Sequence, residues 1–598
     1  MQPMAHIERD LGRAVVYQIY IKSFCDSNGD GIGDLPGITS KLDYLRQLGV
    51  DYLWITPFYP SPQRDNGYDV SDYRAVDPRY GTMDDFRELV AEAHARDLGI
   101  MLDMVLCHTS CEHEWFQRAL AGDERYRRYY LLRSGRGSTG PGDPGEPPTN
   151  WNSIFGGSAW EWEPRLDAWY LHMHDVSQPD LDWTNPEVRS ELADVVRFWK
   201  DLGVDGFRFD VINLISKPEV LVDEPAGNGR RLVADGPHVH EYLRELVECA
   251  GIGELMTVGE MASTTLGECV RYTAPASREL DMAFNFHHLK VDYRNGRKWE
   301  LADPDIGMLR DVFRTWQEGM QENDGWNALF WNNHDQPRAI SRFGGRGGAG
   351  RPDSSWEKVG RMLGICLHFM RGTPFVYQGE ELGMTNPSYG SIEEFDDVES
   401  RNHYRIMIES GKSAAEALRI VNERSRDDGR SPMQWSAGEN AGFTTGRPWI
   451  GVAANYPLVN AQDECASEDS MYAFYRRLIG LRKELEVVSC GEIRFLEAGS
   501  GAPKVIAYER THDDAPAGQP KHLVAICSFD DEPCRAELSL CRDGMRECAP
   551  DGEAMAGDAP IPFVIPAGAK VLAGNYSGVL FDGDAVCLRP FEALALAW

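Results

Sequence analysis

The stretch "VDGFRFDVI" (residues 204–212) reads as a buried β-strand, because Val, Phe and Ile dominate it. Arg208 and Asp210 stand two positions apart and therefore project from the same face of that strand. Oppositely charged residues at the C-terminal end of an apolar strand indicate that this end carries a functional site. The number of similar strands in the chain then decides the fold.

Seven other segments resemble this one, and helix-like segments separate them. They are "VVYQIYI" (15–21), "VDYLWITP" (50–57), "IMLDMVLCH" (100–108), "LMTVGEM" (255–261), "LDMAFNFHH" (280–288), "WNALFWNNHD" (326–335) and "PFVYQGEE" (374–381). This alternation is typical of parallel strands joined by crossover helices. Eight such units predict an α/β fold, a (β/α)8 TIM barrel, with active residues at the C-terminal ends of the strands.

Two insertions and a change of pattern define the expected domains. Residues 1–107 begin the barrel, residues 108–180, which include "GRGSTGPGDPGEPPTN", form an inserted lid domain after the third strand, and residues 181–488 complete the barrel. A long excursion, about residues 380–470, follows the eighth strand. A second Gly-rich run (343–353) predicts a mobile loop near the cleft. Residues 489–598 carry short strands and turns, which predict an antiparallel β-sandwich.

Composition excludes several classes of function. With 61 Lys and Arg against 94 Asp and Glu, the chain has a net charge of −33, which disfavours nucleic acid and acidic membranes as partners. No apolar run reaches the length of a membrane span. Thirteen cysteines without paired spacing indicate a reducing compartment, and the first residues lack the apolar centre of a signal peptide. We therefore expect a cytoplasmic, monomeric protein.

The stretch "DSNGDGIGD" (26–34) predicts a calcium site. It offers oxygen ligands at alternate positions, from the side chains of Asp26, Asn28, Asp30 and Asp34 and the backbone carbonyl of Ile32. An EF-hand would also need a bidentate Glu at position 12, where this chain has Gly37, and a helix before the loop, where the pattern is that of a strand. We expect a static structural Ca²⁺ clip. The alternative is a solvated turn rich in Asp and Gly.

Charged residues at four strand ends form the candidate active site. If the barrel forms, one mouth gathers Asp210, Glu260, Asp335, His108, Arg208 and His334. Two carboxyl groups can serve as nucleophile and acid/base in retaining glycoside cleavage, and a third can stabilise the positive charge that develops on the sugar. Arg208 would keep Asp210 ionised. No organic cofactor is needed for this chemistry.

These segments, "DMVLCH", "GFRFDVIN", "GEM" and "NNHDQPR", resemble in order those of the α-amylase superfamily of retaining α-glycosidases. The resemblance implies that Asp210 is the nucleophile, Glu260 the acid/base and Asp335 the transition-state stabiliser. His108 and His334 would donate hydrogen bonds to the sugar. Cys107 departs from the family, which usually has Asn before this His, so the function of that Asn must be met in another way.

The resemblance also implies a pocket that holds one terminal glucose. In "NGYDV", Tyr68 would stack on the sugar ring and Asp69 would bind its 4- and 6-hydroxyls. An Arg of "SRDDGR" would pair with that Asp. We expect Arg426, although Arg430 is close enough to be confused with it.

The segment "HHLK" bears on the substrate. Val211 after the nucleophile is typical of relatives that act on α-1,6 or trehalose-type links, and similarity to trehalose-6-phosphate hydrolases runs from about residue 14 to the end of the barrel. Relatives that cut isomaltose have an acidic residue, as in a Glu-His-Met-Asp pattern, where this chain has His287, His288 and Lys290, which suggests a phosphate site. The alternatives are an oligo-1,6-glucosidase acting on neutral sugars and, for Lys290, mere neutralisation of nearby acids.

Overall fold

The computed structural model describes residues 9–225, 229–344, 355–540 and 560–598. The first two-thirds of the chain forms an eight-stranded parallel sheet, in the order β10-β11-β1-β2-β3-β7-β8-β9. Its strands are β1 (Val16–Ile19), β2 (Tyr52–Ile55), β3 (Gly99–Met104), β7 (Gly206–Phe209), β8 (Met256–Glu260), β9 (Met282–Phe284), β10 (Ala328–Leu329) and β11 (Thr373–Tyr377). A parallel bridge between Ala283 and Asn327 closes the sheet into a barrel.

All eight expected strands are present, which confirms the predicted TIM-type fold. Several are shorter than their apolar runs. The run at 326–335 pairs only over β10, and the end of the run at 280–288 turns into a 3-10 helix, η4 (His287–Lys290). Most of the Gly-rich run at 343–353 lies outside the described residues.

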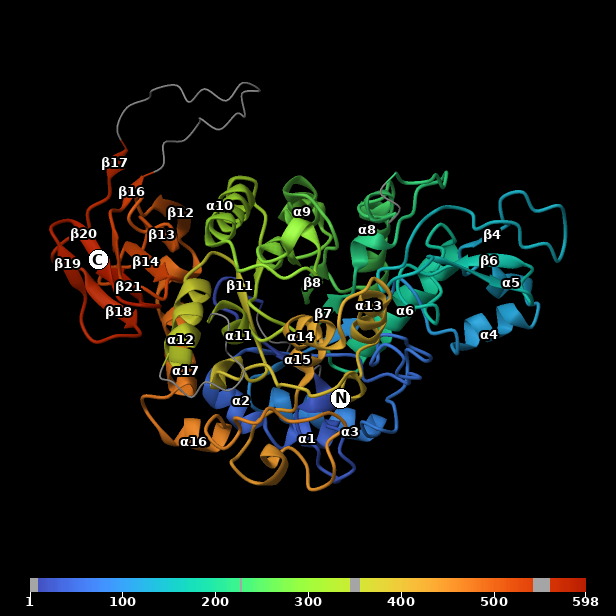
Figure 1. Cartoon of the computed structure of the whole chain (residues 1–598), viewed down its shortest axis with the longest axis horizontal. Helices are drawn as coiled ribbons and strands as arrows, with labels where there is room; N and C mark the ends of the chain where they lie inside the picture. Colours follow the sequence, from blue (N-terminus) through green and yellow to red (C-terminus); the bar gives the residue numbers. More distant parts are fainter. Residues whose placement is uncertain (1–8, 226–228, 345–354, 541–559) are drawn as a thin grey trace.

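Helices surround the barrel (Figure 1). They are α1 (Leu35–Thr39), α2 (Leu42–Leu48), α3 (Met83–His94), α6 (Pro186–Asp201), α7 (Arg230–Val233), α8 (Val239–Ala250), α9 (Leu266–Thr273), α10 (Ile306–Glu322), α11 (Ala339–Phe343), α12 (Ser355–His368), α17 (Met471–Glu484) and α18 (Glu486–Ser489). Their starts follow local chemistry. Asn185 caps α6 with Pro at the first helical position, and Thr82 forms a capping box with Asp85 on α3. Among the described residues no helix is both long enough and apolar enough to span a bilayer.

Side chains fill the barrel interior, so it is a packed core and not a channel. Trp54, Met101, Val258, Met282 and Phe375 belong to one buried apolar cluster inside the ring. A separate cluster packs between the strands and the surrounding helices, so each strand is buried on both faces. The strand ends are therefore held rigidly, which suits a precise site.

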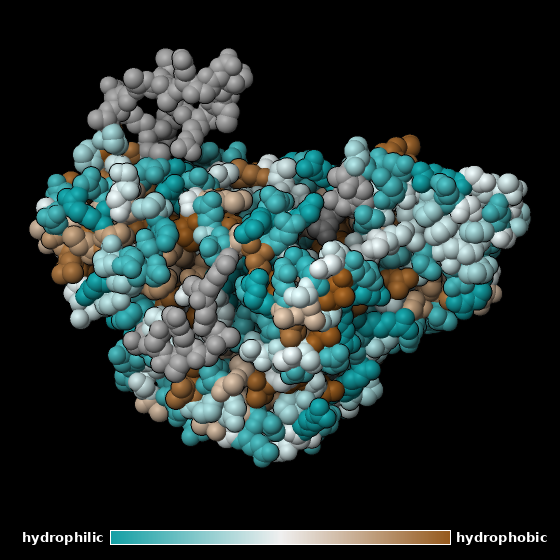
Figure 2. All heavy atoms as spheres, in the orientation of Figure 1, coloured by the Kyte–Doolittle hydropathy of each residue, from teal (hydrophilic) through white to brown (hydrophobic). Residues whose placement is uncertain are grey.

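Three further units extend from the barrel, namely an insertion after β3, an excursion after β11 and a C-terminal β region (Figure 1). The insertion after β3 contains α4 (Glu114–Leu120), α5 (Glu124–Arg127), β4 (Leu132–Arg133), β5 (Trp160–Glu163) and β6 (Ala168–Leu171). The excursion after β11 contains α13 (Val398–Glu409), α14 (Ala414–Arg424), α15 (Asp427–Arg430) and α16 (Ala461–Ala466). On the visible face, hydrophilic residues predominate and apolar residues form separate patches (Figure 2).

The C-terminal region is antiparallel, as predicted. A seven-stranded sheet contains β12 (Glu492–Glu497), β13 (Val505–Thr511), β14 (His522–Ser528), β16 (Ser539–Leu540), β17 (Ile561–Pro562), β18 (Lys570–Gly574) and β21 (Ala593–Ala597). A three-stranded sheet contains β15 (Cys534–Ala536), β19 (Leu580–Asp582) and β20 (Ala585–Leu588). The larger sheet packs on α10 and α12, away from the strand ends that carry the candidate site.

Candidate active site

A cleft of about 520 Å³ lies at the C-terminal ends of the barrel strands. Asp210 follows β7, Glu260 ends β8 and Asp335 follows β10, and all three line this cleft together with Tyr68 and His108. The barrel therefore brings together carboxyl groups that are far apart in the chain. The geometric expectation for these five residues is met.

Arg208 joins the two carboxylates proposed to react. Its Nη1 lies 2.6 Å from Asp210 Oδ1, and its Nη2 donates to Glu260 Oε2. The guanidinium is only 2% exposed, so this bridge is fixed within the protein. Two carboxylates on one planar fork favour the separation of retaining glycosidases, about 5 to 5.5 Å, over the wider gap that a water molecule requires in inverting enzymes. Arg208 does not itself line the cleft.

Asp103 is a site residue that sequence reasoning missed. Its carboxylate accepts hydrogen bonds from Arg208 at 2.7 Å, the Tyr68 hydroxyl at 2.9 Å and the Trp54 indole at 3.2 Å. Burial raises the pKa of Asp103 to about 7, and Arg208 opposes that shift. Asp103 orients both Arg208 and Tyr68 from beneath the cleft. Its position on β3, opposite Arg208 on the paired strand β7, is the signal that could have found it.

His334 supports the cleft from behind. Its ring stacks on Tyr68 at 5.1 Å, and Nδ1 lies 2.8 Å from the side-chain nitrogen of Gln18. The imidazole is 1% exposed and does not line the cleft. Burial lowers the pKa of His334 to about 3, so the ring is neutral near pH 7. The structure therefore places His334 as a support for Tyr68 and not at the surface that meets the sugar.

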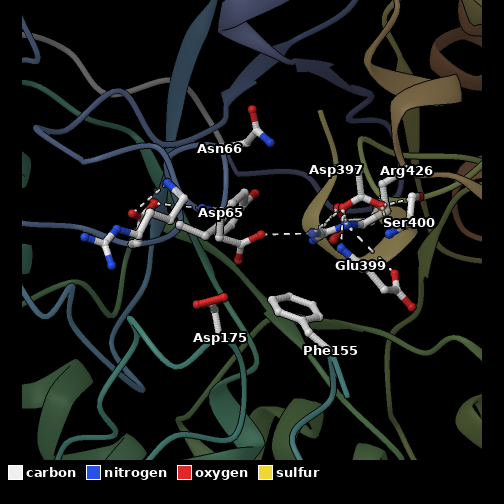
Figure 3. Close-up of polar contacts among 12 residues, drawn as sticks. Asp65, Asn66, Phe155, Asp175, Asp397, Glu399, Ser400 and Arg426 are labelled. Carbon is white, nitrogen blue, oxygen red and sulfur yellow. Dashed lines mark hydrogen bonds and ion pairs between the residues drawn. The ribbon is translucent and has the colours of Figure 1, made fainter. Parts of the chain in front are cut away.

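Buried charges gather around Arg426 in one part of the cleft, here called its inner end (Figure 3). Arg426 Nη2 lies 3.0 Å from Asp65 Oδ1 and 2.6 Å from Asp397 Oδ1, and the Arg426 guanidinium lies 4.8 Å from the centre of the Phe155 ring. Gln178, also missed in the sequence, donates to Asp65 Oδ2 at 3.0 Å. Asp65 and Arg426 line the cleft, whereas Gln178 is fully buried behind them.

Residues 18–491 match the family model described as alpha amylase, catalytic domain. The chain belongs to the α-amylase family. It is 50% identical over 501 residues to trehalose-6-phosphate hydrolase of Bacillus subtilis, which covers 83% of this chain and 87% of that protein. It is 43% identical over 533 residues to oligo-1,6-glucosidase of Bacillus cereus, with 88% and 92% covered. A crystal structure of Bacillus licheniformis trehalose-6-phosphate hydrolase superposes with a TM-score of 0.85 at 43% identity, covering 98% of this chain and 99% of that one. The chain is accordingly a glycoside hydrolase of the α-amylase family.

In this α-amylase-family enzyme the partner of Arg426 is Asp65 and not Asp69, so that expectation is corrected. Asp69 points away from the cleft. It is fully buried, and it accepts hydrogen bonds from the Ser61 hydroxyl at 2.8 Å and the Arg64 amide at 2.9 Å. Asp69 thus holds the loop that presents Asp65. The two acids stand four residues apart, and the loop conformation alone decides which one faces the sugar.

Only one of the three predicted phosphate ligands lies in the cleft. Lys290 is exposed and lines the wall. His288 is 4% exposed and packs among Phe313, Phe330 and Trp331, and burial lowers its pKa to about 3. His287 lies beside Trp316, and burial lowers its pKa to about 4. Since neither histidine lines the cleft or is charged at neutral pH, the phosphate interpretation is corrected to Lys290 alone.

Cys107 is accommodated by a buried lysine. Lys217 Nζ lies 3.6 Å from Cys107 Sγ and 2.7 Å from Asp180 Oδ2. Burial raises the pKa of the Cys107 thiol to about 12, so it stays protonated. Cys107, His108 and Asp180 bring potential metal ligands within 4.8 Å of one another, but the Lys217 ammonium already neutralises this cluster.

The loop at 26–34 carries donors suited to Ca²⁺. Among the described residues, no Lys, Arg or His forms an ion pair with its carboxylates, and the loop contacts the excursion through Asp26, whose amide donates to the Phe443 carbonyl at 3.0 Å. Asp26 also accepts backbone N–H groups of Asn28, Gly29 and Gly31. These oxygens accept hydrogen bonds from within the loop, and carboxylate and amide oxygens are the ligands that Ca²⁺ prefers. The donor set therefore fits the ion.

Proposed function

We propose that this enzyme hydrolyses trehalose 6-phosphate to glucose and glucose 6-phosphate, retaining the configuration of the released glucose. Asp210 would attack the anomeric carbon of the unphosphorylated ring while Glu260 protonates the departing sugar phosphate. Glu260 would then activate a water molecule that cleaves the glucosyl-enzyme bond. Asp335 would stabilise the oxocarbenium-like charge in both steps.

The inner end of the cleft would hold the unphosphorylated glucose. Asp65 and Arg426 offer charged groups to sugar hydroxyls, and Tyr68 and Phe155 offer apolar surface to the ring. Gln178 is fully buried and would act only by holding Asp65. The ion pair between Arg426 and Asp65 would stop the substrate from extending past this end, so that it accommodates one sugar unit. The geometry supports removal of a single glucose from a chain end.

The outer part of the cleft supports a phosphorylated leaving group. Lys290 from η4 lines it, together with Phe286, Trp299 and His403. A Lys ammonium serves as a point charge for a phosphate dianion. That Lys290 lies in the same cleft as the three carboxylates is the observation that carries this proposal. The higher identity to a trehalose-6-phosphate hydrolase than to an oligo-1,6-glucosidase, 50% against 43%, agrees with it.

The test compares substrates on one purified enzyme. Glucose release is measured from trehalose 6-phosphate, trehalose and isomaltose at equal concentrations. We expect kcat/KM for trehalose 6-phosphate to exceed that for either neutral sugar by at least about tenfold, as expected for a charge-assisted contact. Faster release from isomaltose would overturn the proposal in favour of an oligo-1,6-glucosidase.

We further propose that Ca²⁺ is held by Asp26, Asn28, Asp30, Asp34 and the carbonyl of Ile32. The ion would tie the β1–α1 connection to the excursion after β11 and would take no part in the reaction. A chelator should lower Tm, and added Ca²⁺ should restore it. An unchanged Tm would exclude the ion.

We also propose that the enzyme acts in the cytoplasm as a monomer. Size-exclusion chromatography with light scattering would check the oligomeric state.

A further inference from the structure

Arg430 lies beneath the cleft and has no part in the roles proposed above. It ends α15, a single helical turn preceded by Arg426, so the two arginines stand four residues apart on the same face. The turn is pressed against the loop that carries Asp335. A Cβ at Gly429 would lie 2.6 Å from the carbonyl oxygen of Gln336 and 2.8 Å from that of Asn333. Glycine therefore permits the close approach.

Arg430 contacts both the backbone and the carboxylate of this loop. Its Nη2 lies 2.7 Å from Asp335 Oδ1, and its Nε donates to the His334 carbonyl at 3.0 Å. The side chain is fully buried, whereas the Asp335 side chain is 33% exposed. Arg426 lies farther from the same oxygen, at 3.5 Å. One rigid guanidinium thus fixes the direction of Asp335 relative to its own main chain.

The charge of Arg430 also bears on the ionisation of Asp335. Burial alone would raise the pKa of Asp335, but His334, Arg426 and Arg430 together hold it well below its usual range. Because the pKa of His334 is itself lowered to about 3 by burial, its ring is uncharged near neutral pH. The two arginines therefore supply the positive charge nearest to the carboxylate, and Arg430 is the closer.

We propose that Arg430 is a positioning residue that keeps Asp335 ionised and directed at the reacting sugar. Arg430 does not line the cleft and acts only through Asp335. This inference rests on the stabilising role proposed for Asp335. The other charged groups that face Asp335 are His334 on its own loop, Arg426 at the start of α15, Lys298 after β9, and Asp65 and Asp210 across the cleft.

The test uses Arg430→Met, Arg430→Lys and a matched control, Arg338→Met. Arg338 is also buried and donates to the Gly429 carbonyl at 3.1 Å, but among the described residues it contacts no carboxylate of the site. With p-nitrophenyl α-glucoside, we expect Arg430→Met to lower kcat about 100-fold with little change in KM. Because the pKa of Asp335 lies well below its usual range, the loss of kcat should appear at every pH from about 5 to 8 and not as a shift of the acid limb. Arg338→Met should lower Tm but leave kcat and KM within about twofold of the wild-type values.

The lysine variant separates charge from direction. Arg430→Lys keeps the charge, yet one ammonium cannot reproduce the fork, so kcat should fall about tenfold. Should Arg430→Met not fold, a Lys variant with wild-type kcat overturns the inference. A folded Arg430→Met with wild-type kcat, or with a raised KM and an unchanged kcat, overturns it as well. Asp335→Asn distinguishes the two proposals, because full activity in that variant would refute the role of Asp335 itself.

Discussion

The two ends of the cleft are built on different electrostatic principles. At the inner end, Arg426 and Asp65 have side chains only 6% and 5% exposed, and each charge has a fixed partner. At the outer end, Lys290 is exposed, and Trp299 stacks on His403 at 4.9 Å on a half-buried wall. Buried, neutralised charges select one rigid ligand, whereas an exposed lysine attracts charge with little demand on shape. Under the proposed function, the inner end would select the glucose by shape, and the outer end would recognise the leaving group by charge.

The largest effect should come from breaking the inner end. Arg426→Met leaves Asp65 and Asp397 buried beside an apolar side chain, which costs about 3 to 5 kcal/mol of stability when a buried pair loses one member. We expect kcat/KM to fall at least about 100-fold for trehalose 6-phosphate and for p-nitrophenyl α-glucoside alike.

A matched control for this variant is Arg424→Met, which removes another buried arginine, one that binds Asp292 outside the cleft. It should lower stability without changing the ratio of the two activities or abolishing them. A selective loss on the phosphorylated substrate in Arg426→Met would show that the two ends are not separate.

A smaller and selective effect is expected at the outer end. Lys290→Ala should lower kcat/KM for trehalose 6-phosphate about 10- to 100-fold, because a hydrogen bond to a charged group contributes about 1.5 to 3 kcal/mol. Turnover of p-nitrophenyl α-glucoside should change less than about twofold. Steady-state kinetics on both substrates decide the point, and equal losses would assign Lys290 a packing role.

The smallest effect concerns pH at the inner end. Burial raises the pKa of Asp65 to about 7, with Arg426 opposing the shift. As the pH falls through about 7, Asp65 gains a proton and becomes a poorer acceptor for sugar hydroxyls, so KM for the neutral glucoside should rise by up to about tenfold per unit. Asp65→Asn, which cannot titrate, should show a higher KM that is independent of pH in this range. A wild-type KM that is flat from pH 5 to 8 would contradict the assignment.

Most of the acidic residues at strand ends could be predicted from the sequence, whereas the sequence does not decide which of two neighbouring acids on one loop faces the cleft. Asp210, Glu260 and Asp335 end apolar runs, and the barrel brings strand ends to one mouth whatever the loops do. Asp65 and Asp69 lie on one loop, and hydrogen bonds from Ser61 and backbone amides turn Asp69 inward. No periodic pattern in the sequence shows which of the two acids faces the cleft.

The prediction that His287 and His288 join Lys290 in a phosphate site failed for a related reason. It follows β9, but the strand stops at Phe284 and η4 changes the direction of successive side chains. A period of two no longer applies there, so His288 enters the apolar core while Lys290 reaches the cleft. The basic composition of this segment predicted a positive charge on the cleft wall. The local backbone geometry decides that Lys290 supplies that charge.

The turn that bears Arg426 and Arg430 comes some fifty residues after the last barrel strand, which ends at Tyr377. A growing chain that has already made all eight strands would thus hold Asp335 without Arg430 and Arg426, although Arg208 already joins Asp210 and Glu260. The third carboxylate gains its cations only when a later part of the polypeptide folds back onto the barrel. The order of synthesis thereby places completion of the active site after completion of the barrel strands.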